Sequence, residues 1–444
     1  MDELVSLVDK ARQLLNNSVF RFLDELGYGI DYKKNKYYFL DEIGTRIVRD
    51  IVESGSIDID NIAELYGVPS SLVFDDTILF LRQLTEATGI NSSGLPSSQG
   101  MQDEVFFKYF TERRIPLSAI IEITNKCNEH CIHCYRPAAK KEVWRTDLFE
   151  RVCSELKEMG TLQLDFTGGE PFLKKNFLEF LQIADKYGFI ISILTNATLI
   201  DEKAIEILNS LRIRNIYISI YSSSPYVHDK ITGLPGSFEK TLNAIKTLLA
   251  NKIQISLNSS VMTENRHSTS GTKELADSLG VDIKFAYKIS KSYNKSILTN
   301  ELNVFSKSEL SRLIDDPQIR LYADIIESKK SGRIIARDRE RSCDAGFRSI
   351  TISPEGEIIP CTALRLKCGN ILNEKLSELW ENNKNIKYWR DKGSLINEQC
   401  KCCSAYDYCE PCPAGYFADF GSLEGIDETT CGFGKVFSSC ISCS

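Results

Sequence analysis

The segment "ITNKCNEHCIHCYR", residues 123–136, decides the interpretation of this chain, because it places Cys127, Cys131 and Cys134 within eight residues. The residues between the thiols are mostly polar, unlike those of a hydrophobic core. A short apolar run, SAIIEIT, leads into the segment and predicts a strand that ends in a loop. Three thiols in one loop after a strand indicate a metal site.

Length and composition are those of a globular protein. The chain has 444 residues, enough for about three domains, and 42% of them are hydrophobic. No run approaches the ~20 apolar residues of a membrane helix, and the start, MDELVSLVDKARQ, lacks the pattern of a signal peptide. We expect a cytoplasmic protein without membrane contact. A net charge of -7 without a Lys/Arg cluster argues against a nucleic-acid partner.

The fifteen cysteines are unevenly distributed. None precedes Cys127, and eleven lie between Cys343 and Cys443. The cytosol keeps thiols reduced, so metal binding is favoured over disulfides. Only four histidines are present, which leaves few ligands for mixed Cys/His zinc sites.

Residues 1–89 read as a separate module. GYGIDYKKNKYYFLD predicts a hairpin, and three following segments show apolar residues at helical spacing, which together suggest a winged-helix-like domain. Residues 90–104 are rich in Ser, Gly and Gln, and we expect a linker and bridging helix over 90–115.

Residues 116–330 alternate short β-branched runs with helical segments, in six βα-type repeats. Buried strands joined by helices predict an α/β fold with a parallel sheet, either a barrel, partial or full, or a doubly wound sheet. Such folds carry their chemistry on the loops after the strands. The cysteine segment occupies such a loop.

Two metal sites suit the three thiols: zinc with a remote fourth ligand, or a 4Fe-4S cluster bound at three of its irons. The spacing C-x3-C-x2-C after a first strand resembles the radical S-adenosylmethionine superfamily. The resemblance implies a partial (β/α)6 barrel and catalytic Cys127, Cys131 and Cys134 as cluster ligands. It also implies that the open iron chelates S-adenosylmethionine, which is cleaved to a 5'-deoxyadenosyl radical, and that His133 lies near the adenine.

Further segments resemble the cofactor-binding strand ends of that superfamily. LDFTGGEP resembles its GGE segment, which contacts the methionyl amino group, and LTNAT resembles its TNG-type segment, with Ala197 at the glycine position. Ser219 would approach the ribose, whereas Tyr221 and Thr232 differ from many relatives and receive no role. The cofactor-binding residues implied are His133, Thr167, Gly168, Gly169, Glu170, Pro171, Asn196, Ser219 and Asn258.

Residues 331–444 hold cysteines in close pairs on turns rich in Gly and Pro, which fit zinc ribbons. After a radical cluster, the pattern resembles the SPASM domain, which implies two auxiliary 4Fe-4S clusters and three clusters in all. The resemblance, applied position by position, implies that the first auxiliary cluster is held by Cys343, Cys361 and Cys412. The second would be held by Cys400, Cys403, Cys409 and Cys431.

Several cysteines stay unassigned. The first auxiliary cluster lacks one ligand, which is supplied by Cys368, by a tail cysteine or by a substrate thiolate. Cys402 competes with Cys400, and the roles of Cys440 and Cys443 are undecided.

The N-terminal module resembles the RiPP recognition element, which binds leader peptides. A DNA-binding domain is disfavoured because the candidate recognition helix, SSLVFDDTILFLRQL, is acidic. The resemblance therefore implies an enzyme that modifies a ribosomally made precursor peptide, with a donor such as flavodoxin or ferredoxin supplying electrons. The expected product is a crosslink in the form of a Cys thioether. The alternatives are carbon–carbon crosslinking, formylglycine formation, or a zinc-binding regulator without catalysis.

Overall fold

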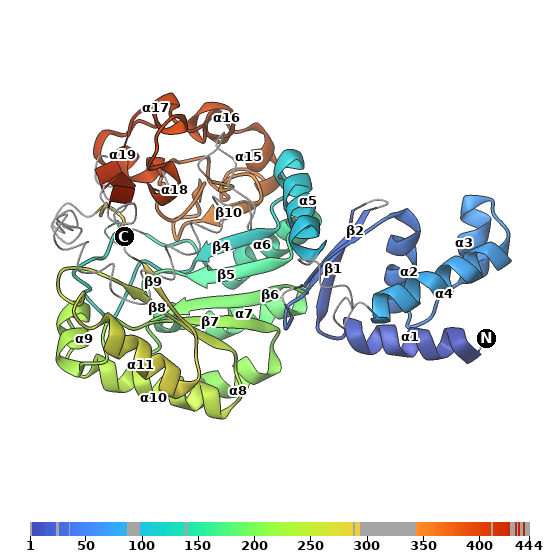
Figure 1. Cartoon of the computed structure of the whole chain (residues 1–444), viewed down its shortest axis with the longest axis horizontal. Helices are drawn as coiled ribbons and strands as arrows, with labels where there is room; N and C mark the ends of the chain where they lie inside the picture. The colour runs from blue at the N-terminus through green and yellow to red at the C-terminus, as the bar shows by residue number, and fades with distance from the viewer. Residues whose placement is uncertain are drawn as a thin grey trace.

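The computed structural model describes residues 2–23, 26–34, 36–86, 98–137, 141–286, 289–293, 343–409 and 412–426, with short pieces at 431–432, 434–435 and 438–439. Three bodies are visible: an N-terminal domain at one end, a strand-and-helix body in the centre, and a C-terminal region of short helices beside it (Figure 1). Among these residues no helix is both long and apolar enough to cross a membrane.

The N-terminal domain is a three-stranded antiparallel sheet, in the order β1-β2-β3, with helices on one side. The predicted hairpin is β2 and β3, in which Asp31 pairs with Lys36. Strand β1 and helix α1 were not predicted. The elements are α1 Asp2–Leu15, β1 Ser18–Leu23, β2 Leu26–Asp31, β3 Lys36–Leu40, α2 Glu42–Glu53, α3 Ile59–Tyr66 and α4 Ser70–Glu86.

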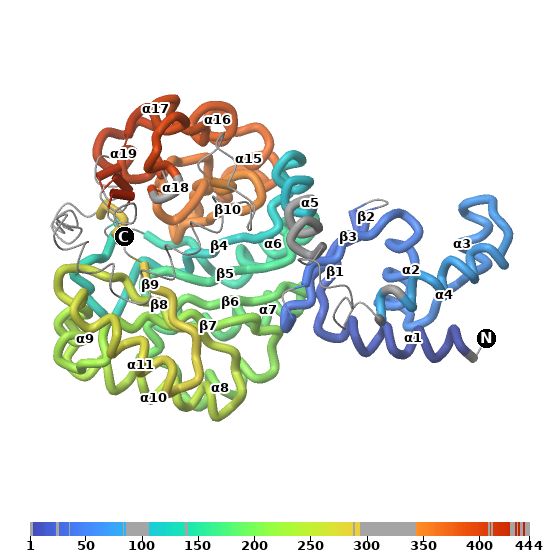
Figure 2. The backbone as a smooth tube through the Cα atoms, viewed as in Figure 1, coloured from blue at the N-terminus to red at the C-terminus, as the bar shows by residue number. Residues whose placement is uncertain are grey.

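Two buried polar side chains attach this domain to the central body. The Tyr28 hydroxyl donates a hydrogen bond to the Gly160 carbonyl at 2.7 Å, and Arg21 Nε donates to the Thr161 carbonyl at 2.8 Å. Helix α5, Ser98–Arg113, fills the remaining space, with Phe110 stacked edge-on against Tyr28. In the tube view of Figure 2, β1 lies on the side of the N-terminal domain that faces the central body.

The central body confirms the predicted partial barrel. Six parallel strands, β4 to β9, are ordered as they occur in the chain, and helices cover their outer face. The elements are β4 Ser118–Glu122, α6 Thr146–Glu158, β5 Gln163–Thr167, η1 Pro171–Leu173, α7 Phe177–Lys186, β6 Ile190–Thr195, α8 Glu202–Ser210, β7 Ile213–Ser219, α9 Pro225–Thr232, α10 Ser237–Ala250, β8 Ile255–Ser260, α11 Thr269–Leu279 and β9 Ile283–Ala286.

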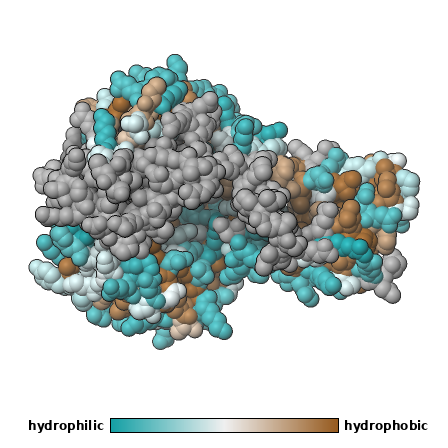
Figure 3. Space-filling view, in the orientation of Figure 1, coloured by the Kyte–Doolittle hydropathy of each residue, from teal (hydrophilic) through white to brown (hydrophobic). Residues whose placement is uncertain are grey.

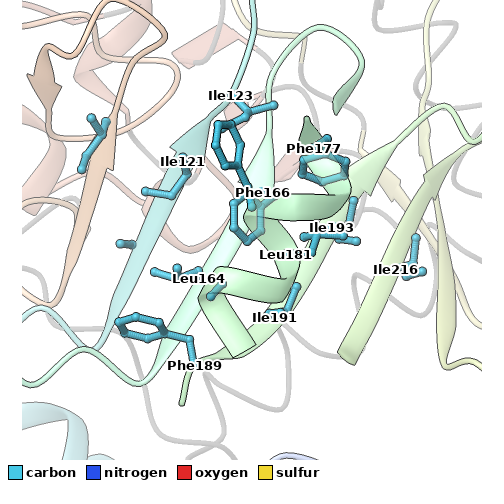
Figure 4. Packing of buried hydrophobic residues seen from close by; sticks show 14 of the residues in the cluster. Ile121, Ile123, Leu164, Phe166, Phe177, Leu181, Phe189, Ile191, Ile193 and Ile216 are labelled. Atoms are coloured by element: carbon cyan, nitrogen blue, oxygen red, sulfur yellow. The ribbon is translucent and has the colours of Figure 1, made fainter. Parts of the chain in front are cut away.

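The main core lies between these strands and their helices. Alternate strand residues such as Leu164 and Phe166 point outward against Phe177 and Leu181 of α7 (Figure 4). The opposite residues of β5, such as Asp165, face the concave side. One face of the sheet is therefore used for packing, which leaves the strand ends and the concave face for function.

The C-terminal region continues the same sheet. Strand β10 pairs in parallel with β4, and β11 pairs with β10, giving the order β11-β10-β4-β5-β6-β7-β8-β9. Buried Trp380 and Trp389 fill the space under its short helices. The elements are β10 Ser349–Ile352, β11 Ile358–Ile359, α15 Leu376–Asn382, α16 Lys384–Tyr388, η2 Trp389–Gly393, α17 Glu398–Lys401, α18 Tyr406–Cys409 and α19 Pro413–Phe420.

Candidate metal and cofactor site

The three-cysteine loop leaves the carboxyl end of β4. Its backbone is fixed from the side by the end of α9, because His130 N donates to the Thr232 carbonyl at 2.8 Å and Ile132 N to the Ile231 carbonyl at 3.0 Å. The three thiols are free and partly buried. Backbone hydrogen bonds to the end of α9 thus help to hold the loop in place.

The predicted ligands Cys127, Cys131 and Cys134 lie close enough to influence one another's charge. Burial raises the pKa of Cys127 to about 11 and that of Cys131 well above the ordinary thiol value, and the neighbouring Glu129 and thiols act in the same direction. In the metal-free chain the Cys127 and Cys131 thiols are therefore protonated. A cationic iron centre would favour the thiolates and relieve this crowding of acidic groups.

The donor set fits an iron–sulfur cluster better than a single ion. Within the described ranges, no three His, Cys, Asp or Glu side chains are close enough to share one metal ion. A 4Fe-4S cluster does not require that proximity, since each thiolate binds a different iron.

The two glycines after β5 lie against the cysteine loop. A Cβ atom on Gly169 would lie 2.0 Å from the Lys126 carbonyl oxygen, and one on Gly168 would lie 2.5 Å from that of Thr124. Their close neighbour within the protein is thus the cysteine loop. Backbone bonds from Gly169 N to Thr124 at 2.8 Å and from Glu170 N to Lys126 at 2.9 Å join the two segments. The glycines allow the loop to lie against the end of β5.

Glu170 is fully buried and bound by protein groups. Its carboxylate accepts hydrogen bonds from Phe172 N at 3.0 Å, Thr195 Oγ1 at 2.7 Å and Asn196 N at 2.8 Å. Burial raises its pKa to about 7, although these donors favour the charged form. The side chain ties the end of β5 to the end of β6, next to Thr167 and Pro171 on either side of the turn.

Asn196 links the end of β6 to the cysteine loop. Its Nδ2 donates to Asn128 Oδ1 at 3.0 Å and lies 4.0 Å from Cys127 Sγ. The next residue, Ala197, has a φ of 62°, the left-handed region that favours glycine. The predicted TNG-like segment therefore keeps the glycine conformation with an alanine.

His133 and Ser219 also lie at this end of the barrel. Burial lowers the pKa of His133 to about 4, and its ring meets the Tyr221 ring edge-on at 4.8 Å. Asn258 pairs with Ser219 across β7 and β8, but β8 continues to Ser260, so Asn258 does not end the strand as expected. Sequence reasoning assigned no role to Tyr221, which the structure places against the cysteine loop.

The structure brings the C-terminal cysteines together in two groups. Burial raises the pKa of Cys361 to about 12, and Cys343 and Cys412 are close enough to add to the effect. A cavity of about 410 Å³ is lined by Cys400, Cys403, Cys409, Cys412 and Cys431. Cys412 thus borders both groups.

The structure separates other cysteines from these groups. Cys402 is exposed and does not line the cavity, which favours Cys400. Cys368 is completely buried in the hydrophobic core, and its thiol donates to the Leu366 carbonyl at 3.4 Å. Cys153 is likewise buried in the core, on α6. Cys440 and Cys443 lie outside the described residues.

Polar contacts join the three-cysteine loop to the group formed by Cys343, Cys361 and Cys412. Arg365, four residues after Cys361, makes a two-pronged ion pair with the buried Glu122 at the end of β4, at 2.6 and 2.8 Å. Tyr135, which is adjacent to Cys134, lies near both side chains and hydrogen-bonds to Thr362. The loops that carry the two sets of thiols are therefore held together by side chains that sequence reasoning did not identify.

Comparison with known families supports this geometry. Residues 121–276 match the model of the radical SAM superfamily, and residues 343–404 match that of SPASM, an iron-sulfur cluster-binding domain.

Relatives and solved structures agree with these matches. The chain is 28% identical over 307 residues to the antilisterial bacteriocin subtilosin biosynthesis protein AlbA of Bacillus subtilis, covering 67% of each chain. It is 26% identical over 324 residues to the AdoMet-dependent heme synthase of Methanosarcina barkeri, covering 68% of this chain and 92% of the relative. Streptococcus suis SuiB bound to precursor peptide SuiA matches with a TM-score of 0.62 at 16% identity, over 94% of this chain and 98% of that chain. The chain therefore contains a radical S-adenosylmethionine domain followed by a SPASM iron-sulfur domain.

Proposed function

We propose that the protein is a radical S-adenosylmethionine maturase that crosslinks a ribosomally made precursor peptide, forming a thioether from a cysteine of that peptide. The proposal rests on three features that occur together in one chain. The barrel presents a three-thiol loop, the C-terminal region presents two further cysteine groups, and the N-terminal domain offers a sheet edge for a peptide.

The barrel residues have distinct roles in this proposal. Cys127, Cys131 and Cys134 hold a 4Fe-4S cluster; with S-adenosylmethionine bound, that cluster supplies a 5'-deoxyadenosyl radical, which removes hydrogen from the peptide. Gly169 and Glu170 fix the loop against the ends of β5 and β6. The same proposal includes the cofactor contacts expected at His133, Thr167, Gly168, Gly169, Glu170, Pro171, Asn196, Ser219 and Asn258.

The N-terminal domain is assigned to leader binding. Within the described residues β3 pairs with β2 alone, so its other edge is available for strand addition. Seven of the fifteen exposed large apolar side chains in the described ranges lie on this domain, among them Phe39 and Leu65. Brown patches mark it in Figure 3. Apolar surface beside a free strand edge suits an extended peptide better than it suits nucleic acid.

The auxiliary groups are assigned two more 4Fe-4S clusters. Among the cysteines of the described residues, Cys343, Cys361 and Cys412 leave one position of the first cluster unfilled, because Cys368 is part of the core. A substrate thiolate can occupy that position, which favours a sulfur-containing crosslink. The name of AlbA, a bacteriocin biosynthesis protein, and the peptide-bound SuiB structure support a peptide substrate.

A reconstitution assay tests the proposal. Anaerobically reconstituted protein is incubated with S-adenosylmethionine, reductant and a Cys-bearing peptide encoded beside its gene. We expect the peptide to lose two hydrogens per crosslink and one alkylatable thiol. An unchanged peptide mass would contradict the maturase function, whereas a loss of two hydrogens with the thiol still alkylatable would indicate a carbon–carbon crosslink.

Metal analysis separates the maturase from a zinc-binding regulator. Three clusters require about twelve irons per chain with matching sulfide. Zinc without sulfide would favour the regulator and rule out radical chemistry.

A further inference from the structure

Residues 289–293 bind the end of the three-cysteine loop. The Ser292 hydroxyl donates a hydrogen bond to the Cys134 carbonyl at 2.8 Å, and Tyr293 N donates to the Tyr135 carbonyl at 3.0 Å. These carbonyls belong to the last predicted ligand of the loop and to the residue after it. The backbone of Tyr293 is therefore fixed to the barrel side of the molecule.

The side chain of Tyr293 reaches the segment that follows Cys361. Its hydroxyl donates to the Ala363 carbonyl at 2.8 Å and accepts a hydrogen bond from Arg365 N at 3.2 Å. The phenol thus uses its one proton and one of its lone pairs on two neighbouring peptide groups. The position of these peptide groups is tied to that of the ring.

The peptide group between Ala363 and Leu364 connects this contact to a predicted cluster ligand. Its oxygen accepts the bond from Tyr293, and its N–H points the opposite way, because the peptide is trans. Leu364 N lies 3.3 Å from Cys361 Sγ and 3.2 Å from the Cys361 carbonyl oxygen. A rotation of this peptide group would move its N–H away from the sulfur.

An ion pair ties the same segment to a third part of the chain. Lys291 pairs with Asp419 of α19, the helix that begins directly after Cys412. The Lys291 side chain is only 13% exposed. Residues 289–293 therefore contact the three-cysteine loop, the segment after Cys361 and the helix after Cys412.

We propose that Tyr293 is a positioning residue, which holds Cys361 and the peptide bound beside it at a fixed distance from the three-cysteine loop. The inference rests on the proposed function, because it assumes that a substrate thiolate binds at the group formed by Cys343, Cys361 and Cys412. Hydrogen removal requires reacting atoms about 3–3.5 Å apart, and a displacement of about 1 Å can cost roughly a hundredfold in rate.

The test compares two products of the reconstituted holoenzyme, 5'-deoxyadenosine and crosslinked peptide. The adenosyl radical becomes 5'-deoxyadenosine when it takes hydrogen from the peptide, and equally when it takes hydrogen from another donor such as a buffer molecule. A loss of folded enzyme lowers both products together, so their ratio reports positioning.

Tyr293→Phe is the first variant. It keeps the ring and the backbone bond to Tyr135 but removes both bonds of the hydroxyl. The amount of crosslink formed per 5'-deoxyadenosine should fall about tenfold or more.

Hydrogen exchange gives a readout that does not depend on turnover. In Tyr293→Phe, Arg365 N loses this acceptor and the Ala363 carbonyl loses this donor. The amides of residues 361–366 should therefore exchange faster than in the wild type, whereas those of residues 131–135 should keep their rates. Unchanged exchange over residues 361–366 would overturn the inference.

The matched control is Tyr388→Phe, which also removes a hydroxyl contact from the C-terminal region. The Tyr388 hydroxyl lies 3.3 Å from Glu424 Oε1 at the surface. Its product ratio should equal that of the wild type. If Tyr293→Phe also shows the wild-type ratio, the inference is wrong while the proposed function stands. If the wild type forms no crosslink, the proposed function itself fails.

Ser292→Ala covers a failure of Tyr293→Phe to assemble its clusters. It removes the bond to the Cys134 carbonyl, so the connection is loosened at its barrel end while the phenol contacts stay. The crosslink formed per 5'-deoxyadenosine should fall again, by less than about tenfold. A wild-type ratio in this variant would count against the proposal.

Discussion

Ala197 shows how a single backbone conformation limits the choice of residue. Its φ of 62° costs an L-amino acid roughly 1–2 kcal/mol, but its methyl group is buried. In Ala197→Gly the relief of strain and the lost methyl contact should offset each other to within about 0.5 kcal/mol. Ala197→Val should lose about 2 kcal/mol or more, because a β-branched residue fits this region poorly. Urea unfolding measures both, and equal losses would contradict the explanation.

Gly169 has no side chain, and this leaves room for the cysteine loop to lie against β5. In Gly169→Ala the new Cβ would meet the Lys126 carbonyl at 2.0 Å and push the cysteine loop away from β5. We expect the reconstituted variant to lose roughly a third of its iron, the share of one cluster in three. Gly236→Ala is the control, because Gly236 has a positive φ but no atom near its Cβ position. A full complement of iron in Gly169→Ala would refute this role.

At the scale of single elements, the residues around the C-terminal cavity separate two adjacent cysteines. Cys403 lines the cavity of about 410 Å³, whereas Cys402 is exposed and does not. Cys403→Ala should lower iron by about four atoms per chain, and Cys402→Ala should leave it unchanged. Iron and sulfide assays of the two variants measure this difference. Equal losses would show that the cavity does not define the second auxiliary site.

The ion pair between Arg365 and Glu122 connects strand β4 with the loop after Cys361. The Glu122 side chain is 1% exposed and that of Arg365 is 12% exposed, so removal of one partner leaves a buried charge. Arg365→Gln should cost about 3–5 kcal/mol of unfolding free energy.

Replacing both residues gives the control for this pair. Arg365→Leu combined with Glu122→Leu should cost less than the two single changes together. Additive losses in urea unfolding would mean that the pair does not act as a unit.

Strands and cysteine groups could be predicted from the sequence, whereas contacts between distant segments could not. Apolar runs such as SAIIEIT located the six barrel strands, and cysteine spacing identified groups that the structure brings together. Periodicity is a local signal, so it could not reveal that β10 joins β4 or that Arg365 reaches Glu122. Strand β1 was missed because SVFRFL is short and is followed by a less regular segment.

At the scale of the whole molecule, buried histidine predicts sensitivity to acid. Burial lowers the pKa of His228 to about 4, below the ordinary value of 6.5. Between these values the unfolded chain binds more protons than the folded chain, so stability is lost as the pH falls through the window. A shift of this size corresponds to at most about 3 kcal/mol. His133 is shifted in the same direction.

His228→Asn tests this sensitivity. Asparagine can still accept the bond from Tyr221 N but does not titrate. The difference in unfolding free energy between about pH 7.5 and about pH 5 should be smaller in the variant than in the wild type. The same difference in both proteins would exclude His228 as a source of acid lability.

The shared sheet also limits how the chain can be divided. The C-terminal region follows the barrel in sequence, yet β10 is hydrogen-bonded along β4. If the chain were cut before residue 343, the backbone groups of β4 that pair with β10 would lose their partners. This open edge would lie beside the three-cysteine loop. Such an open edge invites pairing with other chains. For this molecule, a shortened barrel would be a precursor of aggregates rather than a minimal enzyme.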